Sequence, residues 1–298
     1  MIDLILDTDI GDDVDDAFAL AYAVRHPEIR LRAVTTVWGD VRWRAALALR
    51  LLDDLGMRGV PVGAGHAARS DGAAPTTPTH ISGDVVLAPG TFDARVDPRP
   101  VEDVIWETAR DASEPVWLAT IGPATNAAAA FRRHPALRER LAGVAMMGGR
   151  SAPDALREYN FSSDPAAAVA VCTSGLQVRV GDFLVTRQAQ LTTAALPRIR
   201  TAPGAGASLA AMLATYLQRN ARDWTPMYDP AALSLTLGER FLRLSPTPMT
   251  AGVDAGHVRF AAAVQPSRLR LAAAIDAPAF HDHLLQVVGA DRPADAGQ

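Results

Sequence analysis

The sequence predicts an α/β fold: a single domain with a mostly parallel, doubly wound, Rossmann-like sheet and helices on both faces. The first observation is that short apolar strands alternate with helices, giving three βα units within residues 1–65. The second is that 298 residues with a hydrophobic fraction of 49% can bury one large core. We therefore expect one domain over 1–298, with 291–298 as a frayed tail.

Local signals mark the elements along the chain. The first strand is an apolar run that Gly11 ends with a turn, Gly56 stops the second helix, and Asp164 is the expected N-cap of a later one. In chain order we expect strands at 4–6, 31–37, 60–63, 116–120, 144–149 and 178–180, helices at 17–24, 44–54, 100–113, 166–172 and 209–224, loops at 66–96, 183–186 and 192–208, and strands with a closing helix over 249–284.

Six aspartates follow the first strand; they are Asp7, Asp9, Asp12, Asp13, Asp15 and Asp16. They stand at the carboxyl end of the strand and in the first turn of the helix behind it, where open α/β folds bind ligands. So many like charges raise one another's pKa unless a cation lies among them, and oxygen ligands select a hard ion such as Ca²⁺. Asp12 and Asp13 can equally cap the helix and complement its dipole.

The stretch LDTDIG followed by DDAFAL resembles the amino-terminal signature of the nucleoside hydrolases, the inosine-uridine-preferring family, whose usual form is DTDxGxDDAxAL. Here two extra residues separate Gly11 from the Asp15-Asp16 pair. Further similar stretches follow in family order: TTVWGD at 35–40, IGPATN at 121–126, EYNFSSDPAAA at 158–168 and MYDPAAL at 227–233. The resemblance covers roughly residues 3–235 and implies the nucleoside hydrolase fold.

The resemblance implies a calcium site made of residues far apart in the chain. Asp9, Asp16 and Asp229 would be carboxylate ligands, and the main-chain oxygen of Ile121, left free just before Gly122, would be another. Asp9 would also be the catalytic residue that accepts a proton from the attacking water. A simple strand-to-helix turn explains the residues of IGPATN almost as well.

The resemblance also implies contacts with the substrate. Asp15, Glu158 and Asn160 would lie on the sugar, and Glu158 and Asn160 alternate along a stretch expected to be extended, so both can face one pocket. Asp40 stands where the family usually has asparagine and is a further candidate contact. The asparagine that the family often has about six residues before the glutamate is Ala152 here.

Two residues would lie beside the leaving base. His80 belongs to the long predicted loop, where a histidine is more often solvated. Tyr228 replaces the histidine of the family motif, and a phenol donates a hydrogen bond but is a poorer proton source than an imidazolium at neutral pH. Tyr216 and Trp224 could shield a bound ring, although aromatic residues at helical spacing more often belong to a core.

Composition bounds the partners and the location. The 29 basic and 33 acidic residues leave a net charge of -4 and no electrostatic footprint for nucleic acid or an anionic membrane. The single cysteine, Cys172, excludes an intrachain disulfide and is expected to be buried. No apolar run approaches membrane-spanning length and no signal segment is recognisable, so we expect a cytoplasmic protein. The resemblance adds a homo-oligomer, a dimer or a tetramer. His281 and His283 are expected at the surface.

The expected function is Ca²⁺-dependent hydrolysis of the N-glycosidic bond of a ribonucleoside or a related N-ribosyl compound, giving ribose and free base. The departures at Asp40, Ala152 and Tyr228 surround the substrate rather than the metal, so we expect substrate choice to have drifted. The alternative is a catalytically silent relative that binds a ribosyl ligand. A haloacid-dehalogenase-like phosphatase also has DxD after its first strand but needs a later lysine, and this sequence contains none.

Overall fold

The computed structural model describes residues 1–74, 82–152 and 157–290, so the predicted tail at 291–298 lies outside the described residues. The strands of its main sheet are β1 (Ile2–Thr8), β2 (Ile29–Thr36), β3 (Val62–Ala64), β4 (Val116–Thr120), β5 (Leu141–Met147), β6 (Val178–Gly181), β9 (Leu242–Leu244), β10 (Met249–Asp254), β11 (His257–Ala262) and β12 (Leu269–Ile275). Two short strands, β7 (Gln190–Thr192) and β8 (Trp224–Pro226), pair with each other separately.

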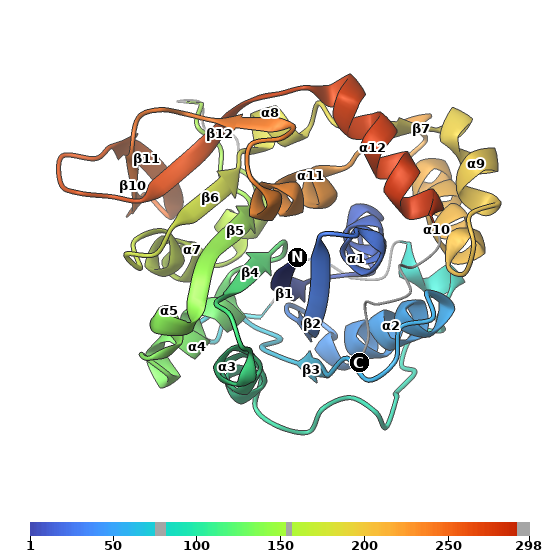
Figure 1. Ribbon diagram of the computed structural model, residues 1–298, viewed down its shortest axis with the longest axis horizontal. Helices are drawn as coiled ribbons and strands as arrows, with labels where there is room; N and C mark the ends of the chain where they lie inside the picture. The colour runs from blue at the N-terminus through green and yellow to red at the C-terminus, as the bar shows by residue number, and fades with distance from the viewer. Residues whose placement is uncertain (75–81, 153–156, 291–298) are drawn as a thin grey trace.

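The main sheet runs in the order β11-β10-β12-β6-β5-β4-β1-β2-β3 (Figure 1). Strands β1 to β6 and β12 pair in parallel, whereas β10, β11 and β9 add antiparallel pairs at the β12 end. The order β3-β2-β1-β4-β5-β6 is that of a doubly wound fold, in which the strand order reverses between β1 and β4. The predicted fold class is therefore confirmed.

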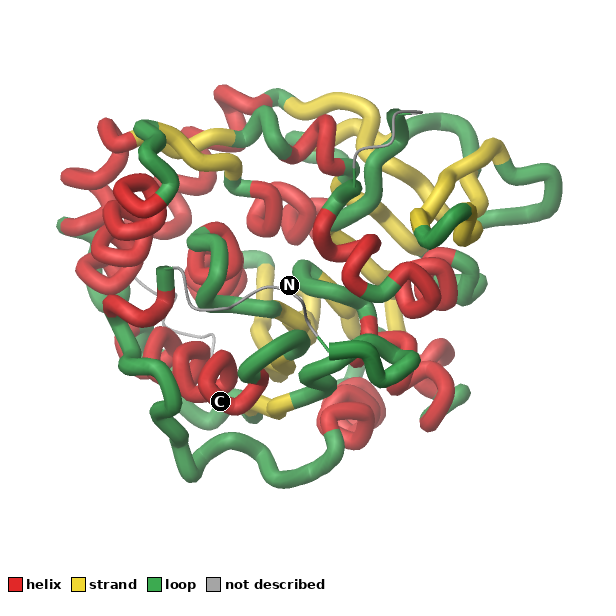
Figure 2. The backbone as a smooth tube through the Cα atoms, turned by 180° about the vertical axis from the view of Figure 1, so that it is seen from behind, coloured by secondary structure: helices red, strands yellow, loops and turns green. Residues whose placement is uncertain are grey.

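Helices cover both faces of this sheet (Figures 1 and 2). One layer contains α3 (Val101–Asp111), α4 (Thr125–Arg133), α5 (Leu137–Arg140) and α7 (Pro165–Cys172), and the other contains α1 (Asp15–Arg25), α2 (Val41–Asp54), α11 (Tyr228–Ser234) and α12 (Ala277–Gly289). The shorter or peripheral helices are α6 (Tyr159–Ser163), α8 (Phe183–Thr186), α9 (Leu196–Arg200), α10 (Gly206–Arg219) and the 3₁₀ turns η1 (Gly83–Val85), η2 (Thr193–Ala195) and η3 (Leu235–Leu237).

Strand β1 shows how the sequence builds two cores. Leu4 and Leu6 are fully buried on the α1 side, whereas Ile5 is fully buried on the α3 side, because successive side chains of a strand point to opposite faces. Burial of each such side chain contributes about 2 kcal/mol of transfer free energy. Asp7 follows the parity of Ile5, and its Oδ1 accepts hydrogen bonds from Thr35 Oγ1 and Asn126 Nδ2, each at 2.7 Å.

Two segments that were predicted to be loops contain helices, so these predictions were wrong. Residues 183–186 form α8, and 192–208 contains η2 and α9. Asp182 explains the first error, because its side chain accepts a hydrogen bond from Leu184 N and caps a helix too short to show any period. The predicted helix at 209–224 begins earlier, at Gly206, and ends at Arg219, which leaves Trp224 in β8.

Other expectations have mixed outcomes. Cys172 is buried and free, as expected. His283 was wrongly expected to be a simple surface residue, because α12 packs on α1 and brings His283 Nε2 to 3.1 Å from the Tyr22 hydroxyl. A search of the described helices for one with the length and apolarity of a membrane span finds none.

Candidate active site

The segments that follow β1 and β4 line the point where the strand order reverses. Asp9 follows β1, Ile121 follows β4, and Ile121 N donates a hydrogen bond to the Asp7 carbonyl at 2.8 Å. Gly122 permits the close approach of these segments, because a Cβ there would lie 2.7 Å from Asp9 Oδ1. The fold therefore opens its ligand crevice between Asp9 and Ile121, as doubly wound sheets do.

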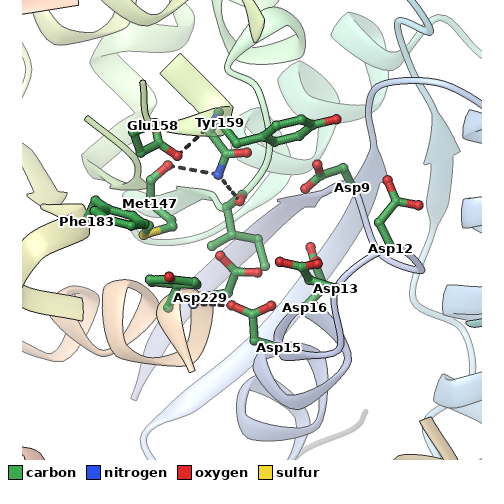
Figure 3. Close-up of a pocket in the computed structure, with 13 residues that line it drawn as sticks. Asp9, Asp12, Asp13, Asp15, Asp16, Met147, Glu158, Tyr159, Phe183 and Asp229 are labelled. Atoms are coloured by element: carbon green, nitrogen blue, oxygen red, sulfur yellow. Dashed lines mark hydrogen bonds between the residues drawn. The ribbon is translucent and has the colours of Figure 1, made fainter. Parts of the chain in front are cut away.

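This crevice contains a cavity of about 300 Å³ (Figure 3). Its lining combines carboxylates with aromatic and apolar side chains: Asp9, Asp12, Asp13, Asp15, Asp16, Ile121, Met147, Glu158, Tyr159, Asn160, Phe183, Tyr228 and Asp229. Among the described residues no lysine, arginine or histidine lines it. The volume suits a small organic ligand, and the lining suits one with a polar half and an apolar half.

Three of these carboxylates converge. Asp15 and Asp16 begin α1, Asp229 is the second residue of α11, and the two helices pack together. One carboxylate oxygen from each lies within 4.8 Å of the others. Asp229 N also donates a hydrogen bond to Asp15 Oδ2 at 3.2 Å, and the Thr8 hydroxyl donates to Asp16 Oδ1. The group is therefore held from three separate segments of the chain.

The electrostatics of this group favour a cation. Burial first, and the neighbouring carboxylates second, raise the pKa of Asp15, Asp16 and Asp229 well above the ordinary value. The same causes raise the pKa of Asp9, where burial and the charge of Asp16 outweigh the opposing charge of Arg44. Buried oxygen ligands without nitrogen or sulfur fit a hard divalent ion. We conclude that the residues present suit such an ion.

Arg44 on α2 holds in place the loop at 9–14, here called the aspartate loop. Its side chain is fully buried, and it donates hydrogen bonds to the carbonyl oxygens of Asp9 and Ile10, the latter at 2.9 Å. Nη2 pairs with Asp12 Oδ2 at 2.9 Å, and Nε donates to the Trp38 carbonyl at 2.7 Å. This guanidinium therefore sets the backbone path that carries Asp9 to the cavity.

Glu158 and Asn160 both line the cavity, but the predicted extended stretch was wrong. Helix α6 begins at Tyr159, and Glu158 is its N-cap. Glu158 accepts hydrogen bonds from the backbone N–H of Gly149 and Asn160, each at 2.8 Å, and of Phe161 at 2.9 Å. Burial nevertheless raises the pKa of Glu158 to about 7. A capped helix start, rather than strand alternation, brings the two side chains into one cavity.

Ile121 lines the cavity. The sequence had suggested that its main-chain oxygen is free, but this oxygen already has a hydrogen-bond partner. It accepts a hydrogen bond from Asn160 Nδ2 at 2.7 Å, and the same nitrogen donates to the Met147 carbonyl at 3.2 Å. A carbonyl oxygen has two lone pairs, so this bond leaves one acceptor direction for a ligand.

The aromatic side of the cavity contains Tyr228 and Phe183. Their rings stack with centroids 5.4 Å apart and an interplanar angle of 21°. Burial, followed by the charges of Asp15 and Asp13, raises the pKa of Tyr228 above its ordinary value. Tyr228 is therefore protonated at neutral pH and can donate a hydrogen bond into the cavity.

Two candidate substrate residues have other outcomes. Asp40 does not line the cavity; it is the N-cap of α2, and its Oδ1 accepts a hydrogen bond from Trp43 N at 3.1 Å. His80 lies outside the described residues. Asp164 caps α7 as expected, since it accepts a hydrogen bond from Ala167 N at 3.1 Å.

Asp12 and Asp13 do not cap α1. The N-cap of that helix is Val14, which makes no side-chain capping hydrogen bond. Instead Asp12 pairs with Arg44, and Asp13 accepts a hydrogen bond from the Tyr216 hydroxyl. The two extra residues of the aspartate loop therefore add carboxylates to the cavity lining rather than to the helix start.

Sequence reasoning missed Arg44, Tyr159, Phe183 and Met147 as residues of the site. Arg44 gave no signal, because its partners in the aspartate loop lie more than thirty residues earlier in the chain. Tyr159 stands between two residues that were selected, and this position was the available signal. Met147 ends β5 and Phe183 comes just after β6, so their places at the cavity needed the topology.

Comparison with known proteins agrees with this geometry. The sequence profile of the inosine-uridine preferring nucleoside hydrolase family matches residues 4–282. The chain is 31% identical over 255 residues to a pyrimidine-specific ribonucleoside hydrolase, RihA, of Enterobacter sp. (strain 638), with 78% of each chain covered. It is 32% identical over 250 residues to the protein of the same name from Shewanella sp. (strain MR-4), covering 78% of this chain and 77% of that one.

Solved structures share the fold. A plant nucleoside hydrolase superposes with a TM-score of 0.83 at 22% identity, covering 97% of this chain and 99% of its own. A purine-preferring ribonucleoside hydrolase from Gardnerella vaginalis superposes with a TM-score of 0.81 at 23% identity, covering 96% and 98%. With the family profile spanning nearly the whole chain, this protein belongs to the inosine-uridine preferring nucleoside hydrolases, which are glycosidases that act on N-glycosyl bonds.

Proposed function

We propose that this protein hydrolyses the N-glycosidic bond of ribonucleosides in a Ca²⁺-dependent reaction that gives ribose and free base. The observation that carries the proposal is the convergence of Asp15, Asp16 and Asp229 within 4.8 Å beside Asp9. The names of the relatives mention both pyrimidine and purine ribonucleosides, so the substrate class proposed is the ribonucleoside rather than one base.

The acidic side of the cavity would hold the ion. Asp9, Asp16, Asp229 and the Ile121 carbonyl are the ligands expected from the sequence, and Asp15 joins them because of its distance to Asp16 and Asp229. When bound, Ca²⁺ would supply positive charge that lowers the pKa of water and orients hydroxyl groups.

The protein's own residues perform the remaining steps. The Asp9 carboxylate accepts a proton from the water that attacks C1′. Glu158 and Asn160, fixed at the start of α6, bind ribose hydroxyls. The surrounding carboxylates stabilise the positive charge that develops on the sugar as the bond to the base breaks. Tyr228 donates a hydrogen bond toward the departing base.

The test is ribose release from uridine and inosine by the purified protein with added Ca²⁺. We expect turnover that a chelator abolishes and that Ca²⁺ restores. Asp9→Asn should lower kcat by about a thousandfold, whereas the matched control Asp111→Asn, at an exposed surface aspartate, should keep wild-type rates. No ribose release from either nucleoside, combined with stabilisation by free ribose, would instead favour a catalytically silent binding protein.

A cytoplasmic location and a homo-oligomeric state, dimer or tetramer, belong to the same proposal. Sedimentation of the purified protein would test the oligomeric state.

A further inference from the structure

Trp38, whose indole bonds to the cavity-lining residue Tyr159, has a strained backbone. It follows the end of β2 with φ of 70°, in the left-handed region that bulky residues avoid. The other non-glycine residues with positive φ in the described ranges are the small Ala221 and Ala255. Backbone strain of this kind persists where the surrounding structure enforces it and is concentrated at functional sites.

The strain is enforced from both sides of the peptide. Trp38 N donates a hydrogen bond to the His66 carbonyl at 2.8 Å, and the Trp38 carbonyl accepts from Arg44 Nε at 2.7 Å. The same Arg44 holds the Asp9 loop. Trp38 is therefore held by the same residue that holds Asp9, and it is only 4% exposed.

The indole of Trp38 contacts Tyr159 through a hydrogen bond. Trp38 Nε1 donates a hydrogen bond to the Tyr159 hydroxyl at 2.9 Å. Tyr159 lines the cavity between Glu158 and Asn160, yet it is 44% exposed, whereas these two neighbours are buried. In Figure 3 its ring extends from the Glu158 side toward Asp9, across the cavity from Asp229. The bond holds the hydroxyl end of the Tyr159 ring in place.

We infer that Tyr159 is a substrate-specificity residue, a fixed aromatic wall for the planar leaving base, and that Trp38 is the positioning residue that holds it. A nucleoside has a hydroxyl-rich half and a planar half, and the carboxylates of the cavity suit the first. Among the described residues, the aromatic side chains that line the cavity are Tyr159, Phe183 and Tyr228, and Tyr159 is the most exposed of the three. Stacking tolerates any planar base but disfavours a puckered one.

The inference rests on the proposed function for its ligand, so its test measures binding rather than turnover. Dissociation constants for uridine and for 5,6-dihydrouridine are measured by calorimetry in an Asp9→Asn background, at a Ca²⁺ concentration that saturates the ion site of this variant. The two nucleosides carry the same sugar and the same carbonyl groups, but the dihydro base is not planar. We expect this background to bind uridine more tightly.

Removal of the ring and removal of the hydrogen bond should give distinct results. Tyr159→Leu should lower the uridine preference about tenfold. Trp38→Phe and Tyr159→Phe should each weaken uridine binding about fivefold, and the double variant no further, because both delete one hydrogen bond. The matched control Trp106→Phe, on α3 and outside the cavity lining, should change neither constant.

An unchanged preference in Tyr159→Leu, additive losses in the double variant, or no binding of either nucleoside would overturn the inference. Absence of ribose release by the wild-type protein, with the preference present and lost in Tyr159→Leu, would overturn the proposed function alone.

Discussion

At the scale of single residues, Arg44 is a buried charge whose partners belong to the site: it holds the loop that carries the site's aspartates. Its guanidinium is fully buried, which is costly unless every donor finds an acceptor. Here the acceptors are the carbonyl oxygens of Asp9, Ile10 and Trp38, together with the Asp12 carboxylate. The positive charge also opposes the repulsion among the cavity aspartates.

We therefore expect Arg44→Ala to lower the free energy of unfolding by about 3–5 kcal/mol, because the change removes the guanidinium that bonds three buried carbonyl oxygens and opposes the charges of the cavity aspartates. The matched control is Arg42→Ala on the same helix, an exposed position where the change should stay within about 0.5 kcal/mol. Urea unfolding of both variants measures the difference. Equal losses in the two would mean that Arg44 contributes only packing.

The residues that the sequence could predict are those whose chemistry shows locally. Asp9, Asp15, Asp16 and Asp229 stand out because acids gather after a strand or precede a proline in a recognisable motif. Arg44 could not be found this way, since nothing near an arginine in a helix distinguishes a buried partner from a solvated face. Individual roles at the substrate, such as those expected of His80 and Asp40, need the topology or the ligand.

At the scale of elements, the interface between α1 and α12 contains a buried histidine. His26 is the C-cap of α1, and its Nδ1 accepts a hydrogen bond from Glu28 N at 3.1 Å. No described residue forms a hydrogen bond with its Nε2. The His283 ring of α12 lies 5.2 Å away, and Arg240 and Glu28 are the nearby charges. Burial, and then His283, lower the pKa of His26 to about 4 from 6.5.

The lowered pKa gives a pH dependence with a definite sign. Between pH 4 and 6.5 the unfolded chain binds a proton at this position that the folded chain does not, so stability is present above pH 6.5 and is lost as the pH falls. From about pH 7.5 to about pH 5 the loss from His26 should be about 2 kcal/mol.

The variant His26→Asn keeps an acceptor near the position of Nδ1 and cannot take up the proton. Its free energy of unfolding in urea should fall by about 2 kcal/mol less than that of the wild type over the same pH interval. Parallel pH profiles for the two proteins would show that His26 titrates normally in the folded state.

The elements themselves were predictable where they are long. Strands β1, β2, β4 and β5 follow from apolar runs, and α2 and α3 follow from their helical spacing and length. Apart from α4, which the sequence offered only as an alternative, the helices that were missed are α5, α6, α8, α9 and α11, and each has four to seven residues. Such segments are helical because of a cap or the packing of their neighbours, which a period of 3.6 residues cannot reveal.

At the scale of the whole molecule, the site brings together residues that are far apart in the sequence. Asp15 and Asp229 are 214 positions apart, and they meet because α1 and α11 pack on the same side of the sheet. The unfolded chain does not hold these acids together, so an ion that binds them binds the folded state alone. Such binding stabilises the protein by an amount that grows with the ratio of free ion to dissociation constant.

We expect Ca²⁺ at about 100 times its dissociation constant to add about 2.7 kcal/mol of stability and to raise Tm by about 4–5 °C. The increase should grow as the pH rises above the ordinary titration range of a carboxyl group, because carboxyls whose pKa is raised must lose their protons before they bind an ion.

The variant Asp229→Asn separates this binding from a general salt effect. Without Ca²⁺ it should melt at a higher temperature than the wild type, because one of three repelling carboxylates is gone; with Ca²⁺ its gain should be much smaller. The matched control Asp276→Asn changes the N-cap aspartate of α12 to another good cap and should keep the wild-type response. Thermal melts at constant ionic strength decide the matter: an equal Ca²⁺ response in all three proteins would mean that the ion does not bind between α1 and α11.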